Sequence, residues 1–159
     1  MSEEPISGDF IFNIPDDHFI AMGKVTVAWG MLESVVDLAI ARLAGFHTFD
    51  PRGAIVTAHM TWPQKMDVME ALVSALLNEH PKLASFPAAK PLLKKAQEGR
   101  NLIAHGQWSY RDGQLVRARA TARGKLRADL KPVALSDIDA VVADISRAGR
   151  TVLKVVFNA

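Results

Sequence analysis

Three polar side chains at the end of an otherwise amphipathic segment have the types that phosphodiester chemistry uses. They are Arg100, Asn101 and His105. Histidine can transfer a proton near neutral pH, and arginine can hold two phosphate oxygens and offset charge that develops in a transition state. Asparagine can orient either of them. Because RNA carries its own nucleophile, the 2′-hydroxyl, such a set could cleave RNA without a metal ion or a serine.

The spacing of the three residues leaves a geometric problem. Asn101 and His105 are four apart and share a helix face, whereas Arg100 and His105 are five apart, about 140° around an ideal helix. The pair can converge through the reach of the arginine, an irregular last turn or a partner chain. The structural alternative is that His105 caps carbonyls while Arg100 and Asn101 tie this helix to Glu33 or Asp37.

Other site chemistries find little support. The chain has no cysteine and five histidines, none in a His-x-x-x-His or Glu-x-x-His arrangement, so we expect no metal site. It contains neither a phosphate-cradling Gly-x-x-x-x-Gly-Lys nor a Gly-x-Ser-x-Gly elbow. We therefore expect no cofactor.

Apolar residues recur at spacings of three and four over most of the chain and predict helices. Gly45 and Gly106 are expected terminators, and Lys65 is expected on a wet face. The predicted helices cover residues 16–44, a short stretch at 53–59, about 62–80, about 88–105, and 136–157, the last with a capping box at Ser136–Asp139 and with a strand as the alternative for 151–157. The four long helices predict an up-and-down four-helix bundle. Residues 1–14 are expected to form an extended arm.

Between the third and fourth long helices the pattern alternates, as in strands. Residues 107–111 and 114–121 flank Asp112-Gly113, which suits a type I′ hairpin turn, and 125–131 is a possible third strand. The sheet would have an apolar face and a basic face. The basic face carries Arg117, Arg119, Lys125 and Arg127. We expect one mainly α domain over residues 1–159, with this β-insertion at about 107–131.

Charge is polarised along the chain. Residues 1–80 hold four basic and eleven acidic residues, a net charge of −7, whereas residues 81–159 hold fifteen basic and six acidic, a net charge of +9. The basic half could bind a polyanion, with Trp108 and Tyr110 stacking on bases. Equally, the halves could neutralise each other, the basic face could be a solvated edge, and the two aromatic rings could cover the core.

No apolar run reaches the roughly 18 uninterrupted residues typical of a membrane span, and the acidic N-terminus lacks the basic region of a signal peptide. We therefore expect a cytoplasmic protein without a membrane partner. The high apolar content, 49% of residues, also makes a self-associating surface plausible.

The Arg100-Asn101-x-x-x-His105 pattern at the end of a bundle's third helix resembles the signature of the HEPN superfamily. The stretch Trp29-Gly-Met-Leu-Glu33 also resembles the first helix of some bacterial members. Many members of that superfamily are metal-independent endoribonucleases of toxin–antitoxin, defence or RNA-processing systems, and others only bind nucleotides. Their sites usually form at a two-fold interface.

The resemblance implies that Arg100 and His105 are the catalytic pair and Asn101 the polar second position. In the ribonuclease hypothesis Asn101 positions one of the pair, and Glu33 orients Arg100 or His105. RNA would bind along Arg117, Arg119, Lys125, Arg127 and Trp108, in a homodimer that an antitoxin protein could control. One departure is Gln107, which stands where toxins of one branch have a tyrosine, so regulation by modification of such a tyrosine is not expected.

Two further hypotheses stay open beside the ribonuclease. The chain could be a non-catalytic homodimeric scaffold or nucleotide-binding module, in which the same three residues form a structural network. It could also be an accessory protein that docks a partner through its acidic first helix and its basic sheet. Whether the chain is an enzyme depends on whether Arg100 and His105 are open to an anion.

Overall fold

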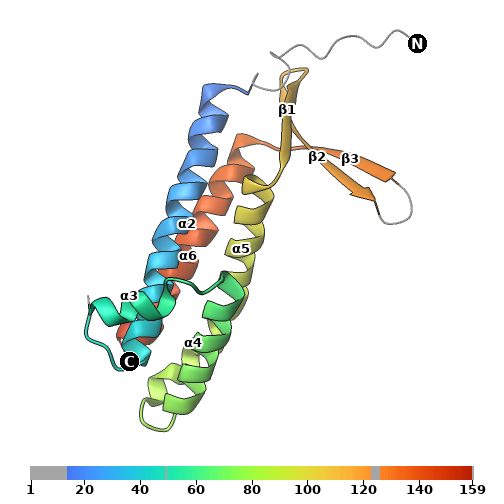
Figure 1. The fold of residues 1–159 in the computed structure, drawn as a ribbon. Coiled ribbons are helices and arrows are strands. Elements are labelled where there is room, and N and C mark those ends of the chain that lie inside the picture. The colour runs from blue at the N-terminus through green and yellow to red at the C-terminus, as the bar shows by residue number, and fades with distance from the viewer. Residues whose placement is uncertain (1–13, 49, 123–125, 159) are drawn as a thin grey trace.

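The computed structural model describes residues 14–48, 50–122 and 126–158, with only the backbone at 111, 119–122 and 126–129. Within these ranges the fold is mainly α-helical with one small antiparallel sheet (Figure 1). The expected arm at 1–14 lies almost wholly outside them. The elements follow in the order α2 (Asp16–Leu43), α3 (Pro51–Thr57), α4 (Trp62–Leu76), the 3₁₀ helix η1 (Pro81–Ala88), α5 (Lys90–Ala104), β1 (Gln107–Arg111), β2 (Gln114–Ala122), β3 (Leu126–Pro132) and α6 (Leu135–Phe157).

The core forms where α2 packs along α6 and where α5 packs on α6, as the ribbon in Figure 1 shows. Leu32 and Val36 of α2 and Ile145 and Val152 of α6 are buried in it. A Cβ at Gly149 would lie 3.7 Å from Leu32 Cδ1, an ordinary van der Waals distance, so Gly149 faces α2 without being required there. The prediction that one helix continues through Gly149 to Phe157 is confirmed, and the strand alternative is not.

Several helix ends obey the local signals of the sequence. Asp50 accepts a hydrogen bond from the backbone N–H of Arg52 at 2.9 Å and caps α3. Gln64 Oε1 accepts from the backbone N–H of Thr61 at 2.8 Å at the start of α4. Gly45, with φ of +84°, follows the end of α2 in the left-handed conformation that glycine adopts without strain.

Several boundaries differ from prediction. Helix α3 spans Pro51–Thr57 rather than 53–59, and α4 ends at Leu76 rather than at about 80. The 3₁₀ helix η1 precedes α5 in a stretch for which no helix was predicted, and its Leu83 and Phe86, at a spacing of three, both reach the core. Helix α6 begins at Leu135, and Asp137 rather than Asp139 accepts the N-cap hydrogen bond, from Ala134 at 2.9 Å. The expected capping box was therefore two residues out of register.

Lys65 is buried, although its place in the helical pattern predicted a solvated face. The side chain is 10% exposed, and its Nζ lies 2.6 Å from Oδ1 of Asp37 on α2. The pattern could not indicate this, because the ion pair joins residues 28 positions apart in the sequence. It attaches α4 to α2 through a partner that neutralises the buried charge.

The hairpin is built as the sequence predicts. Asp112 and Gly113 have φ of 52° and 78°, as the two central residues of a type I′ turn require. β1 pairs antiparallel with β2, and β2 with β3. The third strand, predicted over 125–131, begins at Leu126 and ends at Pro132.

The two faces of the sheet are more mixed than predicted. In register, Trp108 lies opposite Arg117, which lies opposite Lys131, so these three positions share a face. Leu115 belongs to the same face and is 1% exposed in the core. The face that carries the basic residues is therefore buried in the core at Leu115, whereas Leu130 of the opposite face is 54% exposed.

Helix α2 is apolar on both sides. By length and composition alone it could cross a membrane, since 18 of its residues have a mean hydropathy of 1.4, yet only 28% of that window is buried within the chain. Val25 and Leu32 face the core, while Val27 and Met31 are 66% and 67% exposed. An apolar outer face of this kind calls for a partner surface.

Candidate functional site

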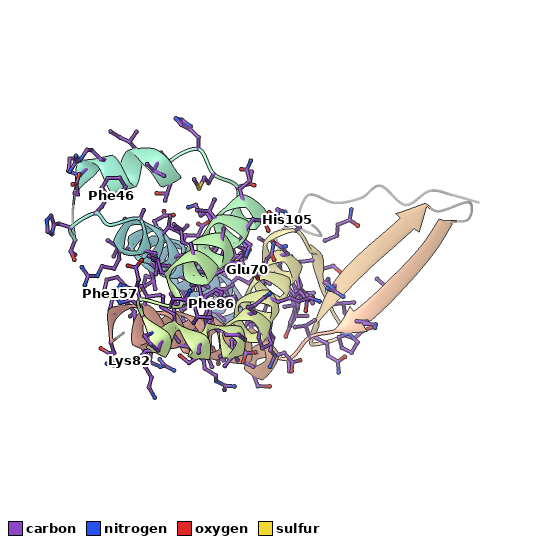
Figure 2. All side chains as sticks on the ribbon, turned by 90° about the horizontal axis from the view of Figure 1, so that it is seen from below. Phe46, Glu70, Lys82, Phe86, His105 and Phe157 are labelled. Atoms are coloured by element: carbon purple, nitrogen blue, oxygen red, sulfur yellow. The ribbon has the colours of Figure 1, made fainter. Side chains whose placement is uncertain are left out.

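Arg100, Asn101 and His105 come together at the carboxyl end of α5. Nη1 of Arg100 lies 3.1 Å from Oδ1 of Asn101 and 3.2 Å from Nε2 of His105. Arg100 is half-buried, whereas Asn101 and His105 are exposed. Figure 2 shows His105 at the edge of the helical part, beside the point where the chain passes into the strands. The three side chains thus form one cluster that an anion can reach from solvent.

The last turn of α5 resolves the angular problem of the motif. The helix ends at Ala104, and His105 is its C-cap with φ of −116° and ψ of 8°, outside helical geometry. The imidazole therefore leaves the ideal helical path, and the long arginine side chain spans the rest. Two of the three expected routes, the reach of Arg100 and an irregular last turn, bring the pair together within one chain.

The donor inventory fixes the hydrogen-bond roles. A guanidinium can only donate, so Nε2 of His105 is the acceptor and carries no proton in this contact, which places the ring proton on Nδ1. Nη1 has two protons, one for Asn101 and one for His105. Within the described ranges the other three N–H groups of Arg100 make no hydrogen bond. They form the edge that can hold two oxygens of one phosphate.

Two tryptophans pack behind Arg100, the first in contact with its guanidinium and the second in contact with the first. Its guanidinium carbon lies 5.6 Å from the centre of the Trp29 ring, a cation–π distance. The Trp29 ring lies 4.4 Å from that of Trp62 on α4, and both are buried. Sequence reasoning missed this support, although Trp29 belongs to the Trp29–Glu33 stretch that carried the resemblance. The rings restrict the positions that the guanidinium can take.

Gly106 and Trp108 hold the junction between α5 and β1. The indole N–H of Trp108 donates to the carbonyl of Ile103 at 3.1 Å, so the ring lies against the last turn of α5. A Cβ at Gly106 would lie 2.7 Å from two atoms of that ring and 2.8 Å from the carbonyl oxygen of Leu102. Only glycine fits between them. The structure thus places Trp108, predicted to bind RNA, against the last turn of α5 close to His105 in sequence.

Glu33 is half-buried on α2, one turn beyond Trp29. In the part of the chain that the structure describes, no hydrogen bond or ion pair joins Glu33 to Arg100 or to His105. Asp37, the other carboxylate considered as a partner for Arg100, is paired with Lys65 instead. The cluster at the end of α5 therefore has no carboxylate partner among the described residues.

The basic residues of the sheet lie at the same end of the molecule as His105, since β1 begins two residues later and the β2–β3 hairpin projects away from the helices (Figure 1). Arg117 is half-buried, and its buried Nε has no hydrogen-bond partner among the described residues. In register, Arg119 pairs with Asp129 and Arg127 with Thr121. The side chains of Arg119 and Arg127, and all of Lys125, lie outside the described part.

No set of three histidine, aspartate or glutamate side chains within the described ranges is arranged to hold a metal ion. Comparisons with protein-family models, with curated proteins and with solved structures find no match for this chain.

Proposed function

We propose that the protein is a metal-independent endoribonuclease of the HEPN type, acting in a toxin or defence system. The observation that carries the proposal is the 3.2 Å contact between Nη1 of Arg100 and Nε2 of His105 on an exposed surface. An unprotonated imidazole nitrogen beside a guanidinium with free donors supplies a base and an anion holder at one place.

In this mechanism Nε2 of His105 takes the proton of the ribose 2′-hydroxyl. The O2′–P bond forms and the P–O5′ bond breaks, which leaves a 2′,3′-cyclic phosphate on one fragment. The departing 5′-oxygen takes a proton from water, and the imidazolium then releases its proton to solvent. Nε2 has a single lone pair, which accepts from Nη1 of Arg100 in this structure, so that hydrogen bond must open when the 2′-hydroxyl binds.

Arg100 stabilises the charge that grows on the non-bridging oxygens. Its three free N–H groups can hold two phosphate oxygens while Nη1 stays with Asn101. Removing one such donor from other enzymes costs about 100-fold to 1,000-fold in rate. Asn101 positions the guanidinium by accepting from Nη1.

We further infer that α2, α4, α5 and α6 form an up-and-down four-helix bundle with the sheet as an insertion, and that two copies associate. Support for the homodimer comes from Val27 and Met31 on the outer face of α2, each about two-thirds exposed. The proposal places the protein in the cytoplasm, with RNA as substrate and an antitoxin protein as a possible regulator.

In this proposal Arg117, with Lys125, Arg119 and Arg127 further along the hairpin, guides the RNA backbone toward the site. Arg117→Glu together with Arg119→Glu should weaken RNA binding and reduce its dependence on salt. Unchanged binding and unchanged salt dependence would remove the sheet from the RNA path.

The test uses purified full-length protein and mixed RNA in EDTA, beside Arg100→Ala and His105→Ala. Cleavage by the unaltered protein that is lost in both variants, with unchanged circular dichroism and thermal midpoint, supports the proposal. Arg147→Ala removes an exposed arginine of α6 and serves as the matched control, which should cleave normally.

A second candidate is a non-catalytic homodimeric module. It is favoured by the same contacts, because both protons of Nη1 are used inside the chain, as in a structural network. This function predicts no cleavage at all, with Arg100→Ala and His105→Ala lowering the stability or the dimer fraction. The EDTA experiment therefore separates the two candidates.

A further inference from the structure

A groove of about 260 Å³ lies between α4 and α5. Its lining includes Trp62, which contacts the Trp29 ring beneath Arg100. Figure 2 labels Glu70 and Phe86, which lie where the two helices face each other. The lining divides into an apolar floor and a polar rim. The floor is formed by Trp62, Met66, Phe86 and Leu93, and the rim by Glu70, Lys90, Lys94 and Gln97.

The groove is continuous with the site in two ways. Trp62 of the floor packs at a tilt against Trp29, whose ring lies under the guanidinium of Arg100. On the rim, Gln97 precedes Asn101 by four residues, which is about 6 Å along a helix. A ligand in the groove therefore ends within about one helical turn of the cluster, which matches the reach from a nucleobase to the phosphate of its own nucleotide.

The charges of the rim are unequal. Nζ of Lys90 lies 2.5 Å from Oε1 of Glu70, so this lysine is neutralised across the groove. Nζ of Lys94 reaches only 3.9 Å from Oε1 of Glu98, and the lysine side chain is 76% exposed. At that distance and exposure the ion pair contributes little to stability, so the ammonium group of Lys94 is available to bind an anion.

The lining suits a flat ring with polar edges. An apolar floor containing aromatic rings accepts the ring of a nucleobase, and the amide of Gln97 offers one acceptor and two donors to its edge. The volume lies below the roughly 300–1,000 Å³ typical of sites for drug-sized ligands, which suits one base rather than two.

We infer that this groove holds the base of the RNA nucleotide next to the cleaved phosphodiester, with Gln97 reading its edge and Lys94 holding the phosphate on the other side of that nucleotide. The inference rests on the proposed function, because it takes Arg100 and His105 as the cleavage site. Its consequence is sequence preference: the protein cuts beside one kind of base more often than beside the others.

The first test measures binding without cleavage. AMP, GMP, CMP and UMP are titrated into the full-length protein while the indole N–H resonance of Trp62 is followed by NMR. We expect one nucleotide to shift this resonance saturably and at least one other to do so about tenfold more weakly. Lys94→Ala should weaken the preferred nucleotide about threefold or more, and Gln97→Leu should reduce the difference among bases. The matched control Gln114→Leu changes an exposed amide on β2 and should alter neither.

The inference is overturned if none of the four nucleotides shifts the Trp62 resonance. It is also overturned if the resonance shifts with protein concentration alone, because the groove would then hold a second copy of the chain. The second test maps cut positions in mixed RNA. Cleavage with equal use of all bases in both the unaltered protein and Gln97→Leu contradicts the groove but leaves the proposed function standing. Nucleotide binding at Trp62 without any cleavage supports the groove and contradicts the ribonuclease.

Discussion

Nη1 of Arg100 lies 3.2 Å from Nε2 of His105, although an ideal helix would direct these two residues about 140° apart. The contact forms because His105 is the C-cap of α5 and leaves the helical path, while Arg100 rests over Trp29. The pair is therefore assembled within one chain, and a second copy is not needed to bring the two groups together.

Arg100→Lys is the sharpest change at the guanidinium. Lysine keeps the positive charge but loses the planar set of donors that serves Asn101, His105 and a phosphate at once. We expect RNA cleavage to fall about 100-fold or more, with little change in stability. Single-turnover cleavage rates measure this loss, with Arg147→Lys as the control. A loss of less than about threefold would contradict the role proposed for the planar donors of Arg100.

Gly106→Ala tests the packing that positions His105. The new methyl group would meet the Trp108 ring and the Leu102 carbonyl at under 3 Å, so the ring must move and its bond to Ile103 is strained or lost. We expect a loss of about 1–3 kcal/mol in the free energy of unfolding together with reduced cleavage.

Denaturant unfolding measures the stability part of that expectation. The neighbouring change Ala104→Ser, at an exposed position, should stay within about 0.5 kcal/mol of the unaltered protein. Equal stability of Gly106→Ala and the unaltered protein would contradict the close approach.

The ion pair between Asp37 and Lys65 predicts that a second substitution restores the stability lost when one partner is removed. Asp37→Ala leaves an ammonium that is 10% exposed without its partner, and we expect a loss of about 2–4 kcal/mol in the free energy of unfolding. Adding Lys65→Met to that variant removes the stranded charge and should restore most of the loss. If the double variant is no more stable than Asp37→Ala alone, the pairing does not hold α4 to α2.

Asp50 predicts a pH dependence at the start of α3. Hydrogen bonds from the side chain and backbone of Arg52 lower the pKa of the Asp50 carboxyl from 3.8 to about 2. Because the folded-state pKa is depressed, the contribution of Asp50 to stability is present above pH 4 and is lost as the pH falls toward 2. An NMR titration of the carboxyl carbon measures this, and Arg52→Ala should raise the pKa toward its ordinary value. An unchanged pKa in that variant would contradict the assigned cause.

Val27→Glu tests the proposed homodimer. The side chain is 66% exposed in the single chain, so a carboxylate there is tolerated in a monomer but not in an apolar interface. We expect the unaltered protein to sediment as a dimer and the variant as a monomer. The control Ala71→Glu, at an exposed position of α4, should remain dimeric. A dimer that persists in Val27→Glu excludes this face.

The sequence predicted what local patterns determine. The course of α2, the type I′ turn at Asp112-Gly113 and the continuation of α6 through Gly149 depend on residues close together in the chain. The start of α6 was misplaced because Asp137 and Asp139 offer similar capping signals, and in the structure Asp137 accepts from the backbone N–H of Ala134.

Contacts between residues far apart in the sequence could not be predicted from local patterns. The burial of Lys65 depends on Asp37, and the support of Arg100 depends on two tryptophans from α2 and α4. Of the candidate site, the sequence identified Arg100, Asn101 and His105, but it could not tell that the end of α5 lets them meet. The hydrogen bond from Trp108 to Ile103, which ties the ring to the end of α5, was not predicted either.

The central claim is that His105 and Arg100 act on a phosphodiester attacked by its own 2′-hydroxyl. The most direct measurement compares, in EDTA, an RNA oligonucleotide that the protein cuts with the same strand carrying one 2′-deoxy residue at the mapped position. The account predicts a 2′,3′-cyclic phosphate on the RNA product, no cut at the deoxy position, and no cut of either strand by His105→Ala. Cleavage of the deoxy strand at the RNA rate, or full activity of His105→Ala, would contradict it.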